Sequence, residues 1–250
     1  MRPFLTLLSD FGTADGYVAE MKGVLLSHLS EATIVDVSHD LAAGDVDGAR
    51  LAVARYWRRF PPGTVHLVVV DPGEGTARRA LAVSSEGRLL VGPDNGVLSP
   101  SLLAAGARAV SLAVPAGASP TFHGRDVFAP AAARLAMGAA VDDLGDLCSD
   151  PEVRRTPEPR RRSDGSVEGQ VIAVDRFGNV ITNLMTRRDG MLEVAGERLP
   201  LRRTYGDAST GELVALTGSS GLVEIAVRDG SAAERLGLCR GAAVLLRPVG

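Results

Sequence analysis

Residues 64–70 read TVHLVVV, a nearly continuous run of β-branched and leucine side chains, and Asp71 follows it directly. Such a run is typical of a strand that is buried on both faces, because the alternation of apolar and polar residues is missing. In open α/β sheets, ligand sites lie at the carboxyl ends of strands of this kind. The sequence therefore predicts a central strand that places Asp71 at a functional edge of a sheet.

The residues before this run alternate strand-like and helix-like patterns, as in a sheet covered by helices. Asp15 and Asp45 each precede a run with apolar residues three and four positions apart. Both are predicted N-caps, because an aspartate oxygen can accept hydrogen bonds from the first amides of a helix. We therefore expect an N-terminal α/β domain in which helices flank a central, largely parallel sheet. Its first predicted elements are a strand at 4–9 (FLTLLS), a helix at 15–29, a strand at 32–37 (ATIVDV) and a helix at 45–59.

A change of composition at 150–166, DPEVRRTPEPRRRSDGS, marks a domain boundary. The stretch is rich in proline and charge and poor in apolar residues, which is typical of an exposed connection. We predict an N-terminal domain at 1–155, a linker at 156–166 and a C-terminal domain at 167–250. The last region has short apolar runs separated by glycine, aspartate and serine, which predicts a small all-β barrel. These runs are VEGQVIAV, NVITNL, MLEVAG, ELVALTG, LVEIAV and AAVLLRP.

The composition restricts the classes of function. Of 250 residues, 45% are hydrophobic and 23% are charged, and the formal net charge is −3 with both signs mixed along the chain. That balance lacks the electrostatic footprint of a protein that binds nucleic acid or an anionic membrane. No apolar run approaches the roughly 20 residues that span a bilayer, the start lacks a signal-peptide pattern, and Cys148 and Cys239 lack metal-ligand spacing. We expect a cytoplasmic protein that acts on a small molecule.

Three runs place polar side chains directly after apolar segments: SDFGTADGYV at 9–18, VVVDPGEGTARR at 68–79 and TFHGRDVFAP at 121–130. They supply a carboxylate, a guanidinium and an imidazole, namely Asp71, Arg78 and His123. A base next to a polarising cation suits the activation of a water molecule. Each residue also has an ordinary interpretation. Asp-Pro-Gly is a plain turn signal, a single arginine is most often solvated, and His123 stands at the start of a helix expected to run to about Met137.

Together with GPDNG at 92–96, AVDRFGNVITN at 173–183 and SSGLVEIAV at 219–227, these runs resemble the S-adenosyl-L-methionine (SAM) hydroxide adenosyltransferases, in order and over essentially the whole chain. These enzymes are the water-using relatives of the fluorinases and chlorinases, which attack SAM with halide. The resemblance implies a homotrimer with active sites between neighbouring subunits. It also implies hydrolysis of SAM to adenosine and L-methionine, with SAM as the substrate and without a cofactor or metal. By the same resemblance, Asp71, Arg78 and His123 match the residues that activate the water.

The resemblance also assigns substrate contacts. Asp10 matches the position that accepts both ribose hydroxyls, a task suited to a carboxylate with two acceptor oxygens. Asp15 and Tyr17 match positions near the methionine portion, and Asn95 lies in the GPDNG loop that is expected to shape the pocket wall near Asp71. The predicted contacts in the C-terminal half are Asp175 and Ser219 at the amino acid, Asn179 at the adenine edge, Phe177 and Tyr205 as stacking rings, and Arg228.

Two positions depart from the family's pattern. Glu74 stands within DPGEGT, where most relatives have a small apolar residue, so an extra carboxylate lies either near the cationic substrate or in solvent. Arg228 replaces the asparagine that is usual after its strand, which leaves the local adenine contact open. The halogenases have tyrosine in place of Asp71 and of His123, and a carboxylate at the first position would repel halide. Hydrolysis is therefore favoured over halogenation.

Two other classes of function stay open from the residues themselves. A protein that captures adenosine or SAM with little turnover would use the same ribose and adenine contacts. A metal-dependent phosphoesterase would use carboxylates and an imidazole as ligands of a divalent ion. Its candidate ligands are Asp10, Asp15, Asp71, Asp94 and His123, whereas His28, His39 and His66 are interpreted as structural.

Overall fold

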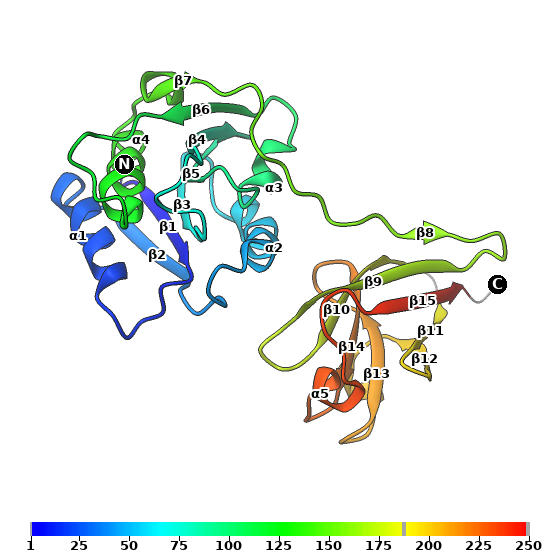
Figure 1. Ribbon diagram of the computed structural model, residues 1–250. Coiled ribbons are helices and arrows are strands. Elements are labelled where there is room, and N and C mark those ends of the chain that lie inside the picture. The colour runs from blue at the N-terminus through cyan, green and yellow to red at the C-terminus, as the bar shows by residue number, and fades with distance from the viewer. Residues whose placement is uncertain (1, 187–188, 249–250) are drawn as a thin grey trace. The chain divides into compact units, whose positions relative to one another are not determined.

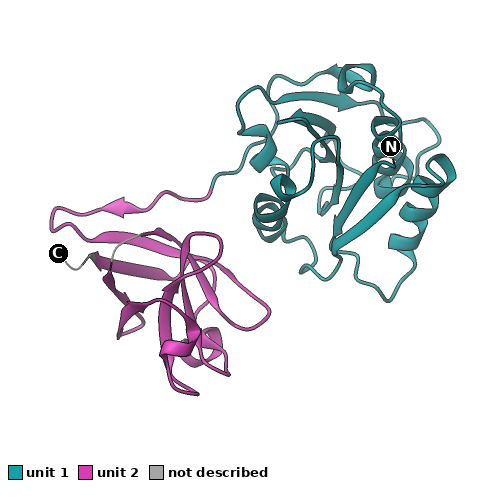
Figure 2. Ribbon diagram, turned by 180° about the vertical axis from the view of Figure 1, so that it is seen from behind, with its two compact units in different colours: residues 1–155 teal, residues 156–250 magenta. Residues whose placement is uncertain are grey.

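The computed structural model describes residues 2–186 and 189–248 of the chain. The chain divides into two compact units, Met1–Arg155 and Thr156–Gly250, drawn in teal and magenta in Figure 2. The division falls within the charged, proline-rich stretch 150–166. Part of the segment 156–166 forms an edge strand of the second unit, because β8 (Arg160–Arg161) pairs with the strand that follows it.

The first unit contains a seven-stranded mixed sheet in the order β2-β1-β3-β5-β4-β6-β7 (Figure 1). Its strands are β1 (Phe4–Ser9), β2 (Thr33–Ser38), β3 (Val65–Val69), β4 (Ala80–Ser85), β5 (Arg88–Pro93), β6 (Arg108–Leu112) and β7 (Gly145–Leu147). The pairings from β2 through β1 and β3 to β5 are parallel, whereas those from β5 through β4 and β6 to β7 are antiparallel. The prediction of a largely parallel sheet therefore holds for one half of the sheet.

A tight hairpin between β4 and β5 starts the antiparallel half. Its two turn residues, Glu86 and Gly87, both have positive φ angles, +46° and +72°, as a hairpin turn of type I′ requires. Glycine adopts this conformation readily, but a glutamate does so at a cost in free energy. Because Glu-Gly is a weaker turn signal than Asn-Gly or Asp-Gly, the sequence pattern does not reveal the hairpin.

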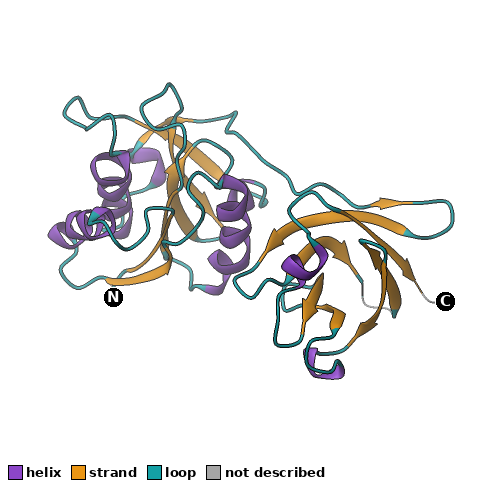
Figure 3. Ribbon diagram, turned by 60° about the horizontal axis from the view of Figure 1, so that its bottom comes forward, coloured by secondary structure: helices purple, strands orange, loops and turns teal. Residues whose placement is uncertain are grey.

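Helices cover both faces of the parallel half of the sheet (Figure 3). They are α1 (Tyr17–His28), α2 (Val46–Tyr56), α3 (Ser99–Leu102) and α4 (Ala129–Ala136), with 3₁₀ turns at Trp57–Arg59 and Val141–Asp143 and a π-helical turn at Gly124–Phe128. On one face, Met21 of α1 joins Leu7 of β1 in a buried core that α4 completes. On the other face, Val53 of α2 packs with Trp57 and Val68 in a second core. No helix in the described ranges has the length and hydropathy needed to cross a membrane.

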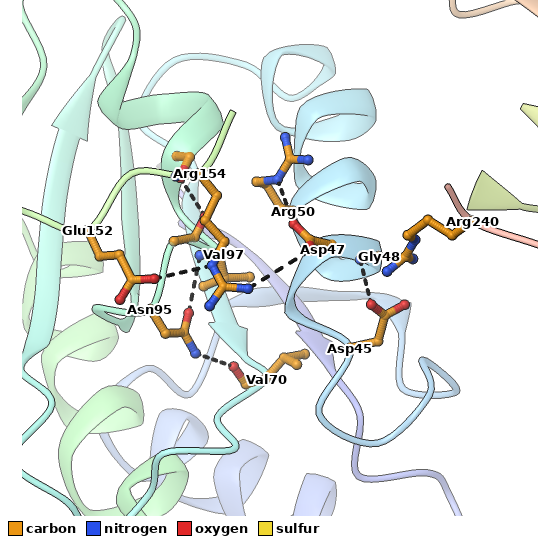
Figure 4. Close-up of polar contacts among 12 residues, drawn as sticks. Asp45, Asp47, Gly48, Arg50, Val70, Asn95, Val97, Glu152, Arg154 and Arg240 are labelled. Atoms are coloured by element: carbon orange, nitrogen blue, oxygen red, sulfur yellow. Dashed lines mark hydrogen bonds and ion pairs between the residues drawn. The ribbon is translucent and has the colours of Figure 1, made fainter. Parts of the chain in front are cut away.

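The two predicted helix caps have different outcomes. Asp45 caps α2, because its side chain accepts a hydrogen bond of 3.0 Å from the amide of Gly48 (Figure 4). Asp15 does not cap α1, and that prediction is wrong: the N-cap of α1 is Gly16. The carbonyl of Gly16 accepts the first helical hydrogen bond, from the amide of Glu20 at 3.0 Å, so Asp15 remains exposed in the preceding loop.

In its described residues the second unit forms a closed barrel of seven strands, and a small barrel is predicted for this half of the chain. The barrel closes because β9 pairs with both β10 and β15, at the two ends of the order β10-β14-β13-β12-β11-β15-β9. Val171, Leu192 and Ile225 contribute to its core. The elements are β9 (Val167–Val174), β10 (Val180–Met185), β11 (Gly190–Val194), β12 (Glu197–Arg202), β13 (Leu213–Thr217), β14 (Leu222–Val227), β15 (Ala243–Pro248), α5 (Ala232–Leu236) and a 3₁₀ turn at Tyr205–Asp207.

The strand β12 is absent from the sequence-based prediction. Its sequence, ERLPLR, contains Pro200, and a proline argues against a central strand because it has no amide hydrogen to donate. In the structure, Pro200 pairs with Met191 of β11, while the ladder with β13 includes only Leu201 and Arg202. The proline is therefore tolerated because it lies outside the second ladder.

His66, in the middle of β3, is fully buried. Its Nδ1 atom lies 2.8 Å from Oγ1 of Thr6, and its ring packs edge-on against Tyr56 and Phe60. Burial, together with the nearby charge of Arg88, lowers the pKa of His66 from 6.5 to about 4. In the pH range between these two values, the folded protein keeps His66 neutral while the unfolded chain binds a proton.

We expect the free energy of unfolding to fall as the pH decreases from about 6.5 to about 4, by up to about 3 kcal/mol from this residue. Above that range His66 is neutral in both states, so its contribution to stability is complete there and is lost on acidification. Urea titrations at about pH 7 and about pH 4.5 measure the difference. His66→Gln should reduce this pH dependence, whereas His28→Gln, at the exposed end of α1, should not. An unchanged pH dependence in His66→Gln would assign it to another group.

Candidate active site

β3 places Asp71 at the carboxyl end of the parallel strands, as its sequence predicts. Arg78 reaches back across the intervening loop and forms a two-point ion pair with it. Nε donates a hydrogen bond of 2.8 Å to Oδ1, and Nη2 donates to Oδ2. The two side chains are 3% and 9% exposed, so the pair is almost completely shielded from water. The fork of the guanidinium against the carboxylate fixes the orientation of both groups.

His123 completes a cluster of three, which we call the triad. Nη2 of Arg78 lies 3.1 Å from Nδ1 of His123. A guanidinium nitrogen can only donate, so Nδ1 accepts and the ring hydrogen of the neutral imidazole is on Nε2. The ring of Phe128 supports the guanidinium, with its centroid 5.1 Å from Cζ of Arg78. The structure thus brings together Asp71, Arg78 and His123, and the arginine connects the other two.

Asn95 supports the end of β3 from the neighbouring loop (Figure 4). Its Nδ2 donates to the carbonyl of Val70 at 2.9 Å, and its Oδ1 accepts from the amide of Val97 at 3.1 Å. The side chain is buried and both of its polar atoms have partners. The geometry therefore favours a role in positioning Asp71, and a direct contact of Asn95 with the substrate stays a prediction.

Asp10 directly follows β1, the strand that pairs with β3 in the sheet. Its Oδ2 accepts a hydrogen bond of 2.7 Å from the amide of Gly44, which leaves Oδ1 to accept from a ligand. His39 contacts the chain on either side of Asp10: its Nδ1 lies 2.7 Å from the side-chain Oγ of Ser9, and its carbonyl accepts from the amide of Gly12 at 2.7 Å. Asp10 is therefore held in place, and its Oδ1 has no hydrogen-bond partner among the residues that the structure describes.

Tyr17 belongs to a group of three aromatic rings beside His123. The ring centroids of Tyr17 and Phe122 are 5.4 Å apart, and Phe11 lies 5.9 Å from each, all with edge-on geometry. Phe122 is buried, but Tyr17 is 48% exposed and so presents aromatic surface to a ligand. Asp15 is exposed in the loop that precedes α1. Both residues are thus accessible, and their contact with the methionine portion stays a prediction.

The β9–β10 loop of the barrel holds three predicted contacts in a fixed turn. Oδ1 of Asp175 accepts from the amides of Phe177 and Asn179, both at 2.9 Å, and Oδ2 accepts from Nδ2 of Asn179 at 2.9 Å. Gly178 has a φ angle of +79°, and a Cβ there would collide with Ser231. The turn leaves Phe177 74% exposed, so its ring is available for stacking.

The remaining three predicted contacts of the barrel do not join that loop in one cluster. The hydroxyl of Tyr205 donates to Oε2 of Glu224 at 3.1 Å, and Ser219 lies on the turn between β13 and β14. Arg228 follows the other end of β14, where its Nη1 donates to the carbonyl of Ala208 at 2.8 Å. Ser219 and Arg228 therefore lie at opposite ends of β14, with the β9–β10 loop at the end of Arg228.

The five side chains considered for a metal-dependent phosphoesterase do not converge. In the described ranges no group of three His, Cys, Asp or Glu side chains has the geometry of a metal site. Asp71 is instead bound to Arg78, and Asp94 accepts from Nε of Arg79 at 2.7 Å. The arrangement suits a reaction that uses a shielded carboxylate, guanidinium and imidazole directly.

The sequence left the place of Glu74 open, and the structure puts it at the triad. Its Oε1 accepts a hydrogen bond of 2.6 Å from the backbone amide of His123. The two residues are 49 positions apart in the chain. No local sequence pattern signals such a contact, because it depends on how two distant loops meet.

Comparison with known proteins identifies the family of the chain. The family model of the SAM hydroxide adenosyltransferase N-terminal domain matches residues 5–145, and that of the C-terminal domain matches residues 169–245. The chain belongs to the SAM hydroxide adenosyltransferase family. A curated relative from Thermus thermophilus, named (R)-S-adenosyl-L-methionine hydrolase, is 43% identical over 98% of this chain and 100% of its own length. A Salinispora tropica protein of the same name is 41% identical, covering 96% and 95%.

A relative with lower sequence identity is named as a fluorinase. A fluorinase of Actinopolyspora mzabensis is 31% identical over 97% of this chain and 96% of its own length. A solved structure of an uncharacterized conserved protein from Thermotoga maritima has a TM-score of 0.87 at 32% identity, covering 97% of this chain and 99% of that one. The solved structure of a conserved hypothetical protein from Thermus thermophilus has a TM-score of 0.83 at 43% identity, covering 98% and 100%. The likeness to these two solved structures thus extends over both units.

Proposed function

We propose that the chain is an enzyme that hydrolyses SAM to adenosine and L-methionine, with water as the second reactant, and that it assembles as a homotrimer. The observation that carries the proposal is the triad, in which Arg78 contacts both Asp71 and His123 in a setting shielded from water. Family membership and two relatives named as SAM hydrolases at 41% and 43% identity support the same reaction.

The proposed reaction is a displacement at the 5′ carbon of the ribose. A bond forms between the water oxygen and this carbon, and the bond from the carbon to the sulfonium sulfur breaks. Its electron pair neutralises the sulfonium, which leaves as the thioether of methionine. No acid is needed, because the leaving group departs without charge. One proton of the water is lost, so each turnover releases one proton.

Each member of the triad has a separate part in this reaction. Asp71 is the proposed acceptor for the proton of the water, because its carboxylate oxygens keep lone pairs beyond those that Arg78 uses. His123, whose Nδ1 accepts from Arg78, presents Nε2–H as a donor that orients the water. Arg78 holds both groups and supplies the positive charge that polarises the water.

The contributions of a positioned base and of substrate orientation to the activation free energy differ in size. Free hydroxide at pH 7 would cost about 12 kcal/mol, from a water pKa of about 15.7 and 1.36 kcal/mol per unit. A positioned base contributes about 10²- to 10⁴-fold in rate, or about 3–5 kcal/mol. In-line orientation of water, carbon and sulfur can supply about 7–11 kcal/mol. Orientation is therefore the larger effect, and the triad does not have to produce free hydroxide.

Asp10 is the proposed anchor of the ribose, through the carboxylate oxygen that Gly44 leaves open. Asp10→Asn is expected to weaken the binding of adenosine by roughly 10- to 100-fold, because hydrogen bonds to a charged group contribute about 1.5–3 kcal/mol. Isothermal calorimetry with adenosine measures the change. Asp40→Asn, which alters an exposed carboxylate near the end of β2, is the control and should bind normally. A normal dissociation constant for Asp10→Asn would remove Asp10 from the site.

The names of the relatives suggest a stereochemical preference. They specify (R) in addition to L-methionine. Because L already defines the α-carbon of methionine, (R) refers to the sulfonium sulfur. We include the same preference in the proposal. Attack at the 5′ carbon gives identical products from both sulfur epimers, so a preference would be seen in the rates alone.

Incubation with a mixture of the two sulfur epimers tests the proposed function. The expected result is adenosine and L-methionine in equal amounts, with faster loss of the (R) epimer, measured by liquid chromatography. Methylthioadenosine or S-adenosylhomocysteine as the nucleoside product would contradict the reaction. Equal rates of loss would contradict the preference alone. Tight binding of adenosine without turnover would indicate a protein that captures the nucleoside.

A further inference from the structure

Glu74 connects the two loops that carry the triad. It lies between Asp71 and Arg78 in the chain, and its Oε1 accepts a hydrogen bond of 2.6 Å from the backbone amide of His123. The loop of Glu74 is itself ordered, since the amide of Glu74 donates to the carbonyl of Asp71 at 3.1 Å and that of Thr76 donates to Gly73 at 3.2 Å. The carboxylate therefore extends from a fixed turn.

The amide that Glu74 accepts from stands at the start of a helical segment. His123 is the N-cap of the π-helical turn Gly124–Phe128, which continues directly into α4. The side chain of His123 makes no capping hydrogen bond to this segment, because its ring is directed to Arg78. Glu74 supplies a carboxylate there from a different loop. A carboxylate close to helix-start amides is favourable, and a hydrogen bond to an ionised acceptor is stronger than one between neutral groups.

His123 is therefore held from two directions. Arg78 contacts its ring at Nδ1, and Glu74 contacts its backbone. The loops also approach closely beside this contact, since a Cβ added to Gly75 would lie 3.0 Å from the carbonyl oxygen of Pro120. The two fixed points leave the imidazole little freedom to turn or to shift relative to the carboxylate of Asp71.

We infer that Glu74 is a positioning residue, which sets His123 against Arg78 through a hydrogen bond to the backbone. This inference rests on the proposed hydrolysis of SAM. The proposed role depends on the acceptor oxygen of Glu74 and on the length of the side chain that carries this oxygen to the amide of His123. The negative charge of Glu74 strengthens this hydrogen bond, and it would also act on the binding of a cationic substrate. Variants that separate the oxygen from the charge therefore test the inference.

Glu74→Ala removes the acceptor, whereas Glu74→Gln keeps an acceptor oxygen at the same reach and loses the charge. Glu74→Ala is expected to lower kcat about 10- to 100-fold with a smaller change in KM, because a shift of about 1 Å in a catalytic group can cost 10²-fold. Glu74→Gln is expected to keep kcat within about threefold of the original protein. If Glu74→Ala does not fold, Glu74→Asp, which is one methylene too short, takes its place. The matched control is Asp143→Ala, which removes a carboxylate that accepts from the amide of Ala140 outside the site at 3.1 Å.

The outcomes separate this inference from the proposed function. Near-normal kcat in Glu74→Ala, or equal losses in the alanine and glutamine variants, would overturn the positioning role. If the unaltered protein makes no adenosine, the proposed function fails. The positioning role of Glu74 is then tested by NMR with ¹⁵N-labelled histidine. The ring nitrogens of His123 should then shift in Glu74→Ala and stay unchanged in Glu74→Gln. Unchanged signals in both variants would overturn the inference.

Discussion

Replacing Asp71 with asparagine is expected to lower kcat by about 10²- to 10⁴-fold, the contribution of a positioned base. The amide keeps the shape of the side chain and one acceptor for Arg78, but it cannot take the proton of the water. The affinity for adenosine should change little, because Asp71 acts on the water rather than on the nucleoside. Steady-state kinetics with SAM and calorimetry with adenosine give the two quantities.

The neighbouring ion pair provides a matched control for this variant. Asp94 pairs with Arg79 at 2.7 Å, and its side chain is 4% exposed, close to the 3% of Asp71. Both asparagine variants remove the charge of a buried, arginine-paired carboxylate, and loss of one partner of such a pair can cost about 3–5 kcal/mol of stability. Asp94→Asn should therefore lose stability while it keeps its turnover. Equal losses of kcat in the two variants would show that Asp71 is a structural residue.

Replacing Arg78 with lysine is expected to lower kcat by about 10²- to 10³-fold, although the charge is kept. The guanidinium donates to both oxygens of Asp71 and also contacts Nδ1 of His123. An ammonium is a compact point charge without the rigid fork, so it cannot hold the same three contacts in one plane. It also loses the stacking on Phe128. Steady-state kinetics with SAM measure the change.

Arg79→Lys is the control for this change, because Arg79 is the next residue and pairs with Asp94 and Asp150 outside the triad. It should retain most of its kcat. If Arg78→Lys kept its turnover within about tenfold, positive charge alone would explain the role of Arg78. The geometry of the fork would then be irrelevant to the reaction.

The sequence predicts those elements of the fold that depend on residues close together in the chain. The run at 64–70 contains the buried strand β3, which ends at Val69 shortly before Asp71, and Asp45 caps a helix. Both features depend on neighbouring residues. The hairpin at Glu86 and the strand through Pro200 go against local preference and are stabilised by pairing with other strands. Local pattern cannot report such pairing.

In the candidate site, too, sequence motifs identify some residues, whereas other contacts depend on how distant loops meet. Motifs identify Asp71, Arg78 and His123, and the structure brings them together from two loops. The contact of Glu74 with the backbone of His123 joins residues 49 positions apart, so it depends on how the loops fold onto each other. Asp15, predicted as a cap, lies in the exposed loop before α1, because the helix begins after it.

Turnover of SAM in water enriched in ¹⁸O tests the central claim most directly. If the triad directs water to the 5′ carbon, the label will appear in the 5′ hydroxyl of adenosine, and methionine will stay unlabelled by mass spectrometry. Attack at another carbon would leave the nucleoside unlabelled, and methylthioadenosine with labelled homoserine would mark attack on the amino-acid chain. Unlabelled nucleoside as the product would contradict the account.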